Sequence, residues 1–145
     1  MIAWRISRAP FADLTGTGAR LYGGRWNSPG RAMVYAAETA ALAVLEVRVH
    51  LDLTPDLLPD DYVLTAIECG APAIEMVTAL PDDPRAFGDR WLAEARTAVL
   101  RVPSFIVPES ANLLLNPAHP DAGPFAVESQ RPFRFDERLW LPANA

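Results

Sequence analysis

Residues 20–46 read RLYGGRWNSPGRAMVYAAETAALAVLE, and three features follow one another within this stretch. A Gly-Gly pair, which marks a turn, introduces Arg25 and Asn27. A short β-type run then places Tyr35, and a helical run of apolar residues carries one carboxylate, Glu46. The stretch therefore offers a cation, an aromatic ring and an acid within one turn–strand–helix unit.

The helical run is too apolar for an ordinary surface helix. Residues 40–45 are all Ala, Leu or Val, so no wide polar face is available for Glu46 to share. An unpaired buried carboxylate is costly, so Glu46 needs either a partner or a function. An arginine from the upstream loop could be that partner, and the pattern leaves a structural ion pair and a functional carboxylate equally open.

Periodicity along the chain predicts short strands and few helices. The expected strands are residues 2–7, 32–36, 61–69, 101–107 and 132–140, and the expected helices run from Thr39 to about Leu51 and from Pro84 to about Leu100. Residues 8–30 are expected to be mostly loop, and a long loop within a domain is more often functional than idle. We predict a single α+β domain over residues 1–145.

Two positions outside the opening stretch are also candidates for the site. Arg5 faces away from the apolar row of its strand, so it must meet an anion if both faces of the sheet are covered. If one face is open, Arg5 is an ordinary surface arginine. Pro103 interrupts the strand over 101–107, which predicts an edge strand or a bulge and leaves Ser104 at an irregular position.

Composition narrows the class of protein. The net charge is −5 and the pI about 4.9, which argues against general binding to nucleic acid or anionic membranes. No apolar run approaches the roughly 20 residues that cross a bilayer, and the first residues do not read as a signal peptide. A single cysteine, Cys69, indicates a reducing compartment, so we expect a cytoplasmic protein.

Several common kinds of site have no matching motif. No Cys or His cluster indicates zinc, no serine has the nucleophile-elbow pattern, and the glycine-rich segment lacks both P-loop and dinucleotide-fold spacing. We therefore expect no metal. All 13 basic residues are arginine, and guanidinium recognises phosphate in a flat, bidentate manner. The remaining residues suit a phosphorylated ligand and a cationic transition state.

The chain resembles the RES domain family, which is named for an Arg, a Glu and a Ser. The segments that carry the resemblance are Trp4-Arg5, Gly23 to Asn27, Val34-Tyr35, Ala40 to Glu46, Val102 to Ser104, Asn116 to Pro120, and Phe135 to Leu139. They span nearly the whole chain. The named residues map to Arg5, or alternatively Arg25, and to Glu46 and Ser104.

The resemblance implies a fold and an activity. The family is similar to a compact ADP-ribosyltransferase with a mixed-sheet core that cleaves NAD+, in some members by hydrolysis or phosphorolysis. A second reading is a protein ADP-ribosyltransferase that uses the same NAD+ site, and a third is a non-catalytic nucleotide-binding module. The family also implies a toxin that pairs with an Xre-type helix-turn-helix antitoxin and forms a homodimer within that complex.

The resemblance also implies roles for individual residues. The residues expected at the NAD+ site are Arg5, Arg25, Asn27, Tyr35, Glu46 and Ser104. Glu46 would bind the nicotinamide ribose and stabilise positive charge, and Arg5 and Arg25 would hold the pyrophosphate. Tyr35 would lie against the nicotinamide ring, and Ser104 would bond the nicotinamide amide or a ribose hydroxyl. These roles require the side chains of the two arginines and of Glu46 to line the same cleft.

Overall fold

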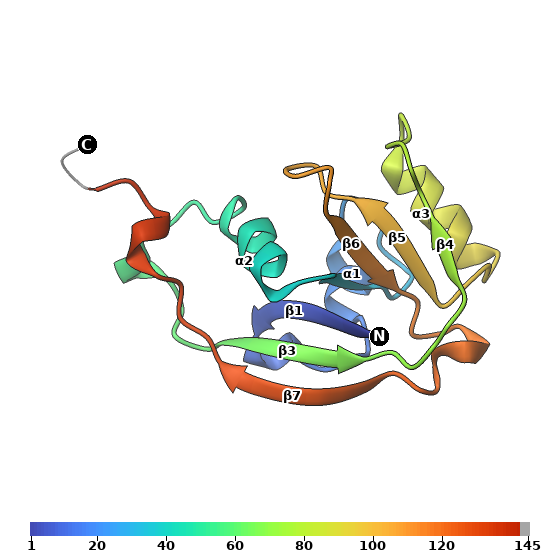
Figure 1. The fold of residues 1–145 in the computed structure, drawn as a ribbon, viewed down its shortest axis with the longest axis horizontal. Coiled ribbons are helices and arrows are strands. Elements are labelled where there is room, and N and C mark those ends of the chain that lie inside the picture. Colours follow the sequence, from blue (N-terminus) through green and yellow to red (C-terminus); the bar gives the residue numbers. More distant parts are fainter. Residues whose placement is uncertain (143–145) are drawn as a thin grey trace.

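The computed structural model describes residues 1–142 as one mixed sheet with a few helices (Figure 1). The strands are β1 (Ile2–Arg8), β2 (Val34–Ala37), β3 (Tyr62–Glu68), β4 (Ile74–Met76), β5 (Val99–Pro103), β6 (Ala111–Leu115) and β7 (Ala126–Pro132). The α-helices are α1 (Thr17–Tyr22), α2 (Ala40–Arg48) and α3 (Pro84–Ala93). Within the described part of the chain the seven strands lie in the order β4-β5-β6-β2-β1-β3-β7, and only β4 and β5 pair in parallel. This arrangement confirms the predicted α+β class.

The sheet is weakly joined between β1 and β2. In the described chain these two strands share a single residue pair, Trp4 with Ala37, whereas β1 and β3 pair from Ile2–Glu68 to Arg8–Tyr62. Figure 1 shows β1, β3 and β7 as one group of strands and β6, β5 and β4 as another. Strand β2 pairs along its length with β6 and so belongs to the second group. Helix α2 packs against both β1 and β2, so it covers the junction between the two groups.

Helix α2 begins where the sequence predicts. The Thr39 hydroxyl accepts a hydrogen bond from the backbone N–H of Leu42 at 3.1 Å, which caps the first turn. Leu42 and Ala43 are buried in a cluster with Ile6, and the other residues of the helix are half-buried or exposed. The helix ends at Arg48 rather than near Leu51.

The predicted helix from Pro84 to Leu100 is too long. It begins correctly, because the Asp83 side chain caps the N–H of Ala86 at 3.0 Å, but it ends at Ala93. Ala95 then adopts a positive φ of 49°, and the chain turns into β5. The apolar run that we assigned to the helix is a buried strand between β4 and β6, and periodicity alone does not separate these cases.

The predicted closing strand over 132–140 is wrong. The last strand is β7, which is exposed along its whole length and ends at Pro132. Phe135 instead packs edge-to-face against Phe133 and Trp140, with ring centroids 4.9 and 6.1 Å away. The Trp140 indole N–H donates to the Leu53 carbonyl at 3.0 Å. The aromatic alternation in this segment therefore reflects packing beside α2 rather than pairing within the sheet.

Pro103 does not mark an edge strand, because β5 lies between β4 and β6. Strand β4 pairs only with Val99 to Arg101, so the proline lies beyond the β4 ladder and no hydrogen bond from its nitrogen is needed there. Ser104 follows as the first residue outside the strand, which agrees with the predicted irregular position. The predicted loop over 8–30 contains α1 and several turns.

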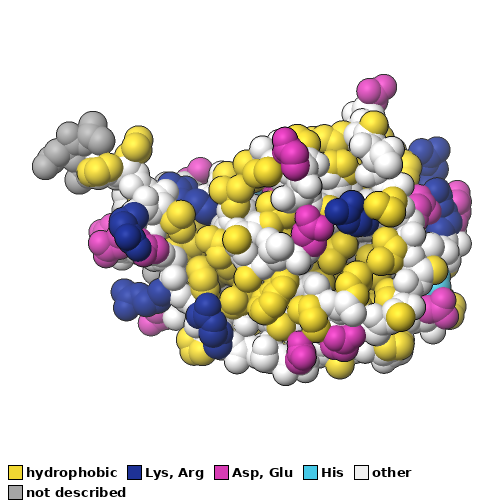
Figure 2. All heavy atoms as spheres, in the orientation of Figure 1, with side chains coloured by type: hydrophobic (Ala, Val, Ile, Leu, Met, Phe, Trp, Pro, Cys, Tyr) yellow, Lys and Arg dark blue, Asp and Glu magenta, His cyan; other side chains and the backbone are white. Residues whose placement is uncertain are grey.

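The surface of the described residues is mixed in character. Figure 2 shows hydrophobic side chains across the middle of one face, with arginine, aspartate and glutamate side chains among and around them. Among residues 1–142, no helix is both long and apolar enough to cross a membrane.

Candidate active site

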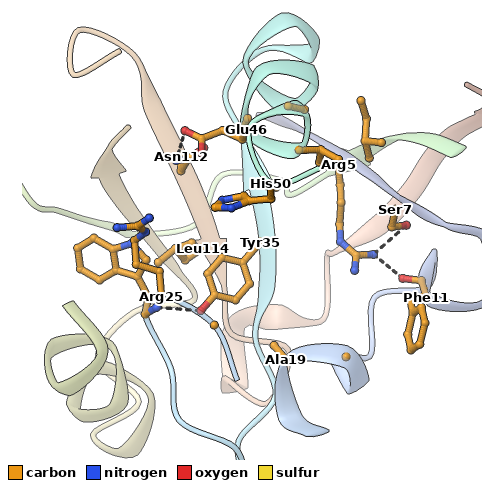
Figure 3. A pocket seen from close by; sticks show the side chains of 18 of the residues that line it. Arg5, Ser7, Phe11, Ala19, Arg25, Tyr35, Glu46, His50, Asn112 and Leu114 are labelled. Carbon is orange, nitrogen blue, oxygen red and sulfur yellow. Dashed lines mark hydrogen bonds between the residues drawn. The ribbon is translucent and has the colours of Figure 1, made fainter. Parts of the chain in front are cut away.

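A cavity of about 540 Å³ opens at the junction between β1 and β2. It is lined by residues of both strands, of α2 and of the glycine-rich loop (residues 23–30). Figure 3 shows side chains that surround it. Arg5, Arg25, Tyr35 and Glu46 all line this one cavity. The structure therefore brings together four of the six residues predicted for the site.

The Glu46 carboxylate is fixed by two neutral donors. Its Oε1 atom accepts hydrogen bonds from the Ser104 hydroxyl at 2.6 Å and from the Asn112 amide at 2.9 Å. Within residues 1–142, the other carboxylate oxygen has no hydrogen-bond partner, and no cation lies within ion-pair distance of Glu46. The structural ion pair left open by the sequence is therefore not formed.

Ser104 supports Glu46 from behind. The residue is fully buried and does not line the cavity. Its hydroxyl donates to Glu46 and accepts from the backbone N–H groups of Ile106 and Val107 at 3.0 and 3.1 Å. These three bonds use the donor and both acceptor sites of a hydroxyl. The predicted direct bond from Ser104 to the ligand stays a prediction; the geometry shown here is one in which Ser104 orients the acid.

Asn112 was not predicted. It lies on β6, opposite Ala37 of β2, and it lines the cavity beside Glu46. Its position carries a signal, because it is the one polar residue in the strand Ala-Asn-Leu-Leu-Leu. A polar side chain in an otherwise apolar strand must find a partner.

Arg5 is a partly buried cation without a carboxylate partner among the described residues. Its guanidinium donates to the carbonyls of Phe11 and Asp13 and, at 3.5 Å, to the Ser7 hydroxyl. Burial lowers the pKa of Arg5, and the Asp13 carboxylate opposes this shift. By contrast, the neighbouring Arg8 pairs with Asp61 through bonds of 2.7 and 2.9 Å. Of these two arginines, Arg5 is the one free to receive an anion.

Arg25 lies over an aromatic ring at another side of the cavity. Its guanidinium carbon is 3.9 Å from the ring centroid of Phe105, and both residues line the cavity. This cation–π contact orients the arginine while leaving its charge unpaired with any carboxylate in the described chain.

Asn27 holds the glycine-rich loop together instead of facing the cavity. The residue is fully buried, and its amide donates to the carbonyls of Ala19, Ser28 and Arg31 at 3.0, 3.1 and 3.3 Å. Its side-chain oxygen accepts from the Tyr35 hydroxyl at 2.6 Å. The predicted contact with NAD+ stays a prediction, and the predicted role in shaping the loop fits this geometry.

Close contacts fix the position of this loop. The Tyr35 hydroxyl accepts from the Trp26 N–H at 3.0 Å, and a Cβ on Gly24 would lie 2.5 Å from the same hydroxyl oxygen. On the other side, a Cβ on Gly88 of α3 would lie 1.8 Å from the Trp26 carbonyl oxygen. The Asp89 carboxylate next to Gly88 accepts from the Ser28 N–H at 2.8 Å and from its hydroxyl at 2.6 Å.

Tyr35→Phe should lower the free energy of unfolding by about 1–3 kcal/mol, because Asn27 and the Trp26 N–H would each lose a partner. Any catalytic rate that depends on the cavity should change little, since phenylalanine retains the face of the aromatic ring. Urea denaturation of both proteins at neutral pH measures the stability change. Equal midpoints would contradict the hydrogen-bond arrangement.

The same pair of proteins should respond differently to alkaline pH. Burial raises the pKa of Tyr35 to about 12, whereas a tyrosine in an unfolded chain ionises near about pH 10. Between these values the folded protein keeps a proton that the unfolded chain has lost, so the stability falls as pH rises. Tyr35→Phe should therefore lose less stability than the wild type over this range. Parallel slopes would contradict the burial of Tyr35.

His50 also lines the cavity, although the sequence pattern did not single it out. It follows Glu46 by four residues, and this spacing was the signal available. Within residues 1–142, no group of three or more His, Cys, Asp or Glu side chains is arranged to hold a metal ion.

Comparison with known proteins identifies the family. The RES domain family matches residues 2–136. A protein of Sphingobium sp. named "Prs ADP-ribosylating toxin" is 42% identical over 88% of this chain and 86% of its own length. A Pseudomonas putida protein named "Toxin Res" is 39% identical over 97% of this chain and 100% of its own.

A solved structure shares the fold. The crystal structure of the M. tuberculosis MbcT–MbcA toxin–antitoxin complex contains a chain that superposes with a TM-score of 0.76 at 20% identity, covering 92% of this chain and 84% of that one. The likeness is one of fold, since the identity is low. The match along residues 2–136 shows that this chain belongs to the RES domain family.

Proposed function

We propose that this protein is the toxin of a toxin–antitoxin pair and that it cleaves the bond between nicotinamide N1 and ribose C1′ of NAD+. The main support is that Arg5 and Glu46 line one cavity without neutralising each other. NAD+ matches this arrangement, because its pyrophosphate is anionic and its ribose gains positive charge as nicotinamide leaves. The cavity volume of about 540 Å³ lies within the usual range for ligand sites.

The relatives support the toxin assignment. Two curated relatives are named as toxins, one of them as ADP-ribosylating, and the structural neighbour comes from a toxin–antitoxin complex. The partner we propose is an Xre-type helix-turn-helix antitoxin whose C-terminal part covers the cavity, with the toxin forming a homodimer in that complex. A gene for such a protein beside this one would support the pairing.

The chemistry assigned to Glu46 is electrostatic. With Oε1 held by Ser104 and Asn112, the other oxygen can accept a hydrogen bond from a ribose hydroxyl. The fixed negative charge then stabilises the oxocarbenium-like transition state as the N1–C1′ electron pair passes to nicotinamide. Nicotinamide leaves as a neutral molecule, so it needs little help from an acid.

The remaining cavity residues bind the substrate. The Tyr35 ring offers a face to the flat, cationic nicotinamide, while its hydroxyl remains bonded within the loop. Arg5 and Arg25 hold the pyrophosphate, and Arg25 reaches it from its position over Phe105. Ser104 and Asn27 support Glu46 and the loop without touching the ligand.

Arg5→Gln should lower kcat/KM for NAD+ about 10- to 100-fold, because a hydrogen bond to a charged group contributes about 1.5–3 kcal/mol. Arg8→Gln is the matched control, because Arg8 also lines the cavity but its guanidinium is occupied by Asp61. Initial rates over a range of NAD+ concentrations measure both variants. If the two variants lose the same amount, Arg5 is not the anion site.

Product analysis tests the function as a whole. The purified protein is incubated with NAD+ alone, with inorganic phosphate, and with a cell lysate, and the products are identified by mass spectrometry. Hydrolysis yields ADP-ribose, phosphorolysis yields its phosphate ester, and transfer yields ADP-ribosylated protein. The name of the Sphingobium relative favours transfer as the second candidate function. NAD+ that binds but stays intact under all three conditions would show a non-catalytic module.

A further inference from the structure

His50 lies where it can act on the same ligand as Glu46. The backbone N–H of Val49 bonds to the Leu45 carbonyl at 3.2 Å, and that of His50 bonds to the Val47 carbonyl at 3.1 Å. The chain therefore makes one further turn after α2, which keeps His50 on the side of the helix that carries Glu46. Figure 3 shows the imidazole of His50 between the side chains of Glu46 and Tyr35.

The His50 imidazole is also available for chemistry. Within the described chain its ring nitrogens make no hydrogen bond and no ion pair, and the residue is exposed. His119 offers a contrast, since one ring nitrogen lies 3.0 Å from the Ala95 carbonyl and the other accepts from the Asp121 N–H at 2.9 Å. These hydrogen bonds explain His119, whereas none of residues 1–142 bonds to the imidazole at position 50.

The proposed reaction needs a group that takes up a proton. When water attacks C1′, it must lose a proton, and Glu46 is already committed to stabilising the cationic sugar. The other ionisable residues that line the cavity are Arg5, Arg8, Tyr22, Arg25 and Tyr35. Arginine cannot accept a proton. Burial raises the pKa of Tyr35 to about 12, so its hydroxyl stays protonated at neutral pH, and Tyr22 lies at the rim with 76% of its surface exposed.

We propose that His50 is a catalytic residue that accepts the proton of the attacking molecule, an inference that rests on the proposed cleavage of NAD+. The N1–C1′ bond breaks and its electron pair remains on nicotinamide. The oxygen of water forms a bond to C1′, and the proton of that water passes to a ring nitrogen of His50. Imidazole is the side chain best suited to this exchange near neutral pH.

The rate gained from a proton acceptor depends on which molecule attacks C1′. Water and a protein hydroxyl must each lose a proton, whereas inorganic phosphate already carries a deprotonated oxygen that can attack directly. A positioned base contributes about 10²-fold or more to such steps. His50 should therefore support hydrolysis strongly and phosphorolysis weakly, a difference that a merely structural histidine would not produce.

The test compares two reactions of the same variant. Hydrolysis is measured in phosphate-free buffer and phosphorolysis with added inorganic phosphate, for wild type, His50→Gln and the control Asp52→Asn. Asp52 is exposed, lies two residues beyond His50 and does not line the cavity. His50→Gln should lower kcat for hydrolysis by about 10² with little change in KM. Its rate of phosphorolysis should stay within about threefold of wild type. Asp52→Asn should match wild type in both reactions.

Other outcomes overturn the inference. Equal losses in both reactions would indicate a structural role, and a raised KM with kcat retained would indicate that His50 binds NAD+ instead. Unchanged hydrolysis, or a wild type that cleaves NAD+ only when inorganic phosphate is present, would remove the need for a base. In each of these cases NAD+ cleavage by the wild type still stands. Only a wild type that leaves NAD+ intact would overturn the proposed function and this inference together.

Discussion

Glu46→Gln should lower kcat for NAD+ cleavage by about 10²–10³, the usual loss when one preorganised electrostatic group is removed. Glutamine retains a carbonyl oxygen that can accept from Ser104 and Asn112, so the local packing is preserved. What disappears is the negative charge opposite the developing oxocarbenium ion. The expected signature is a large fall in kcat with a small change in KM and an unchanged melting temperature.

Glu109→Gln is the matched control for this experiment. Glu109 belongs to the same connection between β5 and β6 as Ser104, but it is exposed and does not line the cavity. Its loss should leave the rate unchanged. If purified Glu46→Gln consumed NAD+ as fast as wild type, the role assigned to Glu46 would be wrong. If it lost stability along with activity, the carboxylate would be structural.

Gly88→Ala should lower the free energy of unfolding by about 3 kcal/mol or more, which is at the upper end for overpacking. The added Cβ would lie 1.8 Å from the Trp26 carbonyl oxygen, a distance that no rotamer can relieve, because both atoms are fixed by the backbone. Helix α3 and the glycine-rich loop must therefore move apart. Since that loop carries Arg25, activity should fall as well.

Gly123→Ala separates this clash from a general effect of replacing glycine. Gly123 has φ −51°, and a Cβ there would meet nothing within 4 Å. Removing backbone freedom from the unfolded chain at such a position changes stability by about 1 kcal/mol at most, in the stabilising direction. Urea denaturation of the two variants beside wild type measures both changes. Similar stability for Gly88→Ala and wild type would mean that α3 does not rest on the loop at this point.

The parts of the site that follow from local sequence were predictable. Glu46 could be recognised because six apolar residues precede it in a helix, and the Thr39 cap fixes where that helix begins. Arg5 could be recognised because it alternates with an apolar row on β1. In each case one segment contains both the unusual residue and the pattern that makes it unusual.

The residues that depend on long-range packing were not predictable in the same way. Ser104 and Asn112 meet Glu46 across sequence separations of 58 and 66 residues, and no local pattern shows that all three hydrogen-bond together. The sequence therefore predicts Ser104 as a candidate for the site but does not predict its bond to Glu46. The bonds of Asn27 were not predictable for a similar reason, since its partners are carbonyls that the folded loop brings around it.

The errors in secondary structure have a related cause. The run from Ala98 to Leu100 is apolar enough for either a buried strand or a buried helix, and its pairing with β4 and β6 decides the outcome. Strand β7 is exposed at every position, so it lacks the alternation of apolar and polar residues that identifies a strand in a sequence. It is defined by its hydrogen-bonded pairing with β3.

One short turn connects both charged sides of the cavity. Ser104 bonds to Glu46 and to the backbone at Ile106, and Phe105 between them carries the guanidinium of Arg25. A protein segment that displaced this turn would move both Glu46 and Arg25 without entering the cavity. Displacements near 1 Å can cost about 10² in rate. If the proposed activity holds, an inhibitor can therefore act on this surface turn as well as inside the cavity.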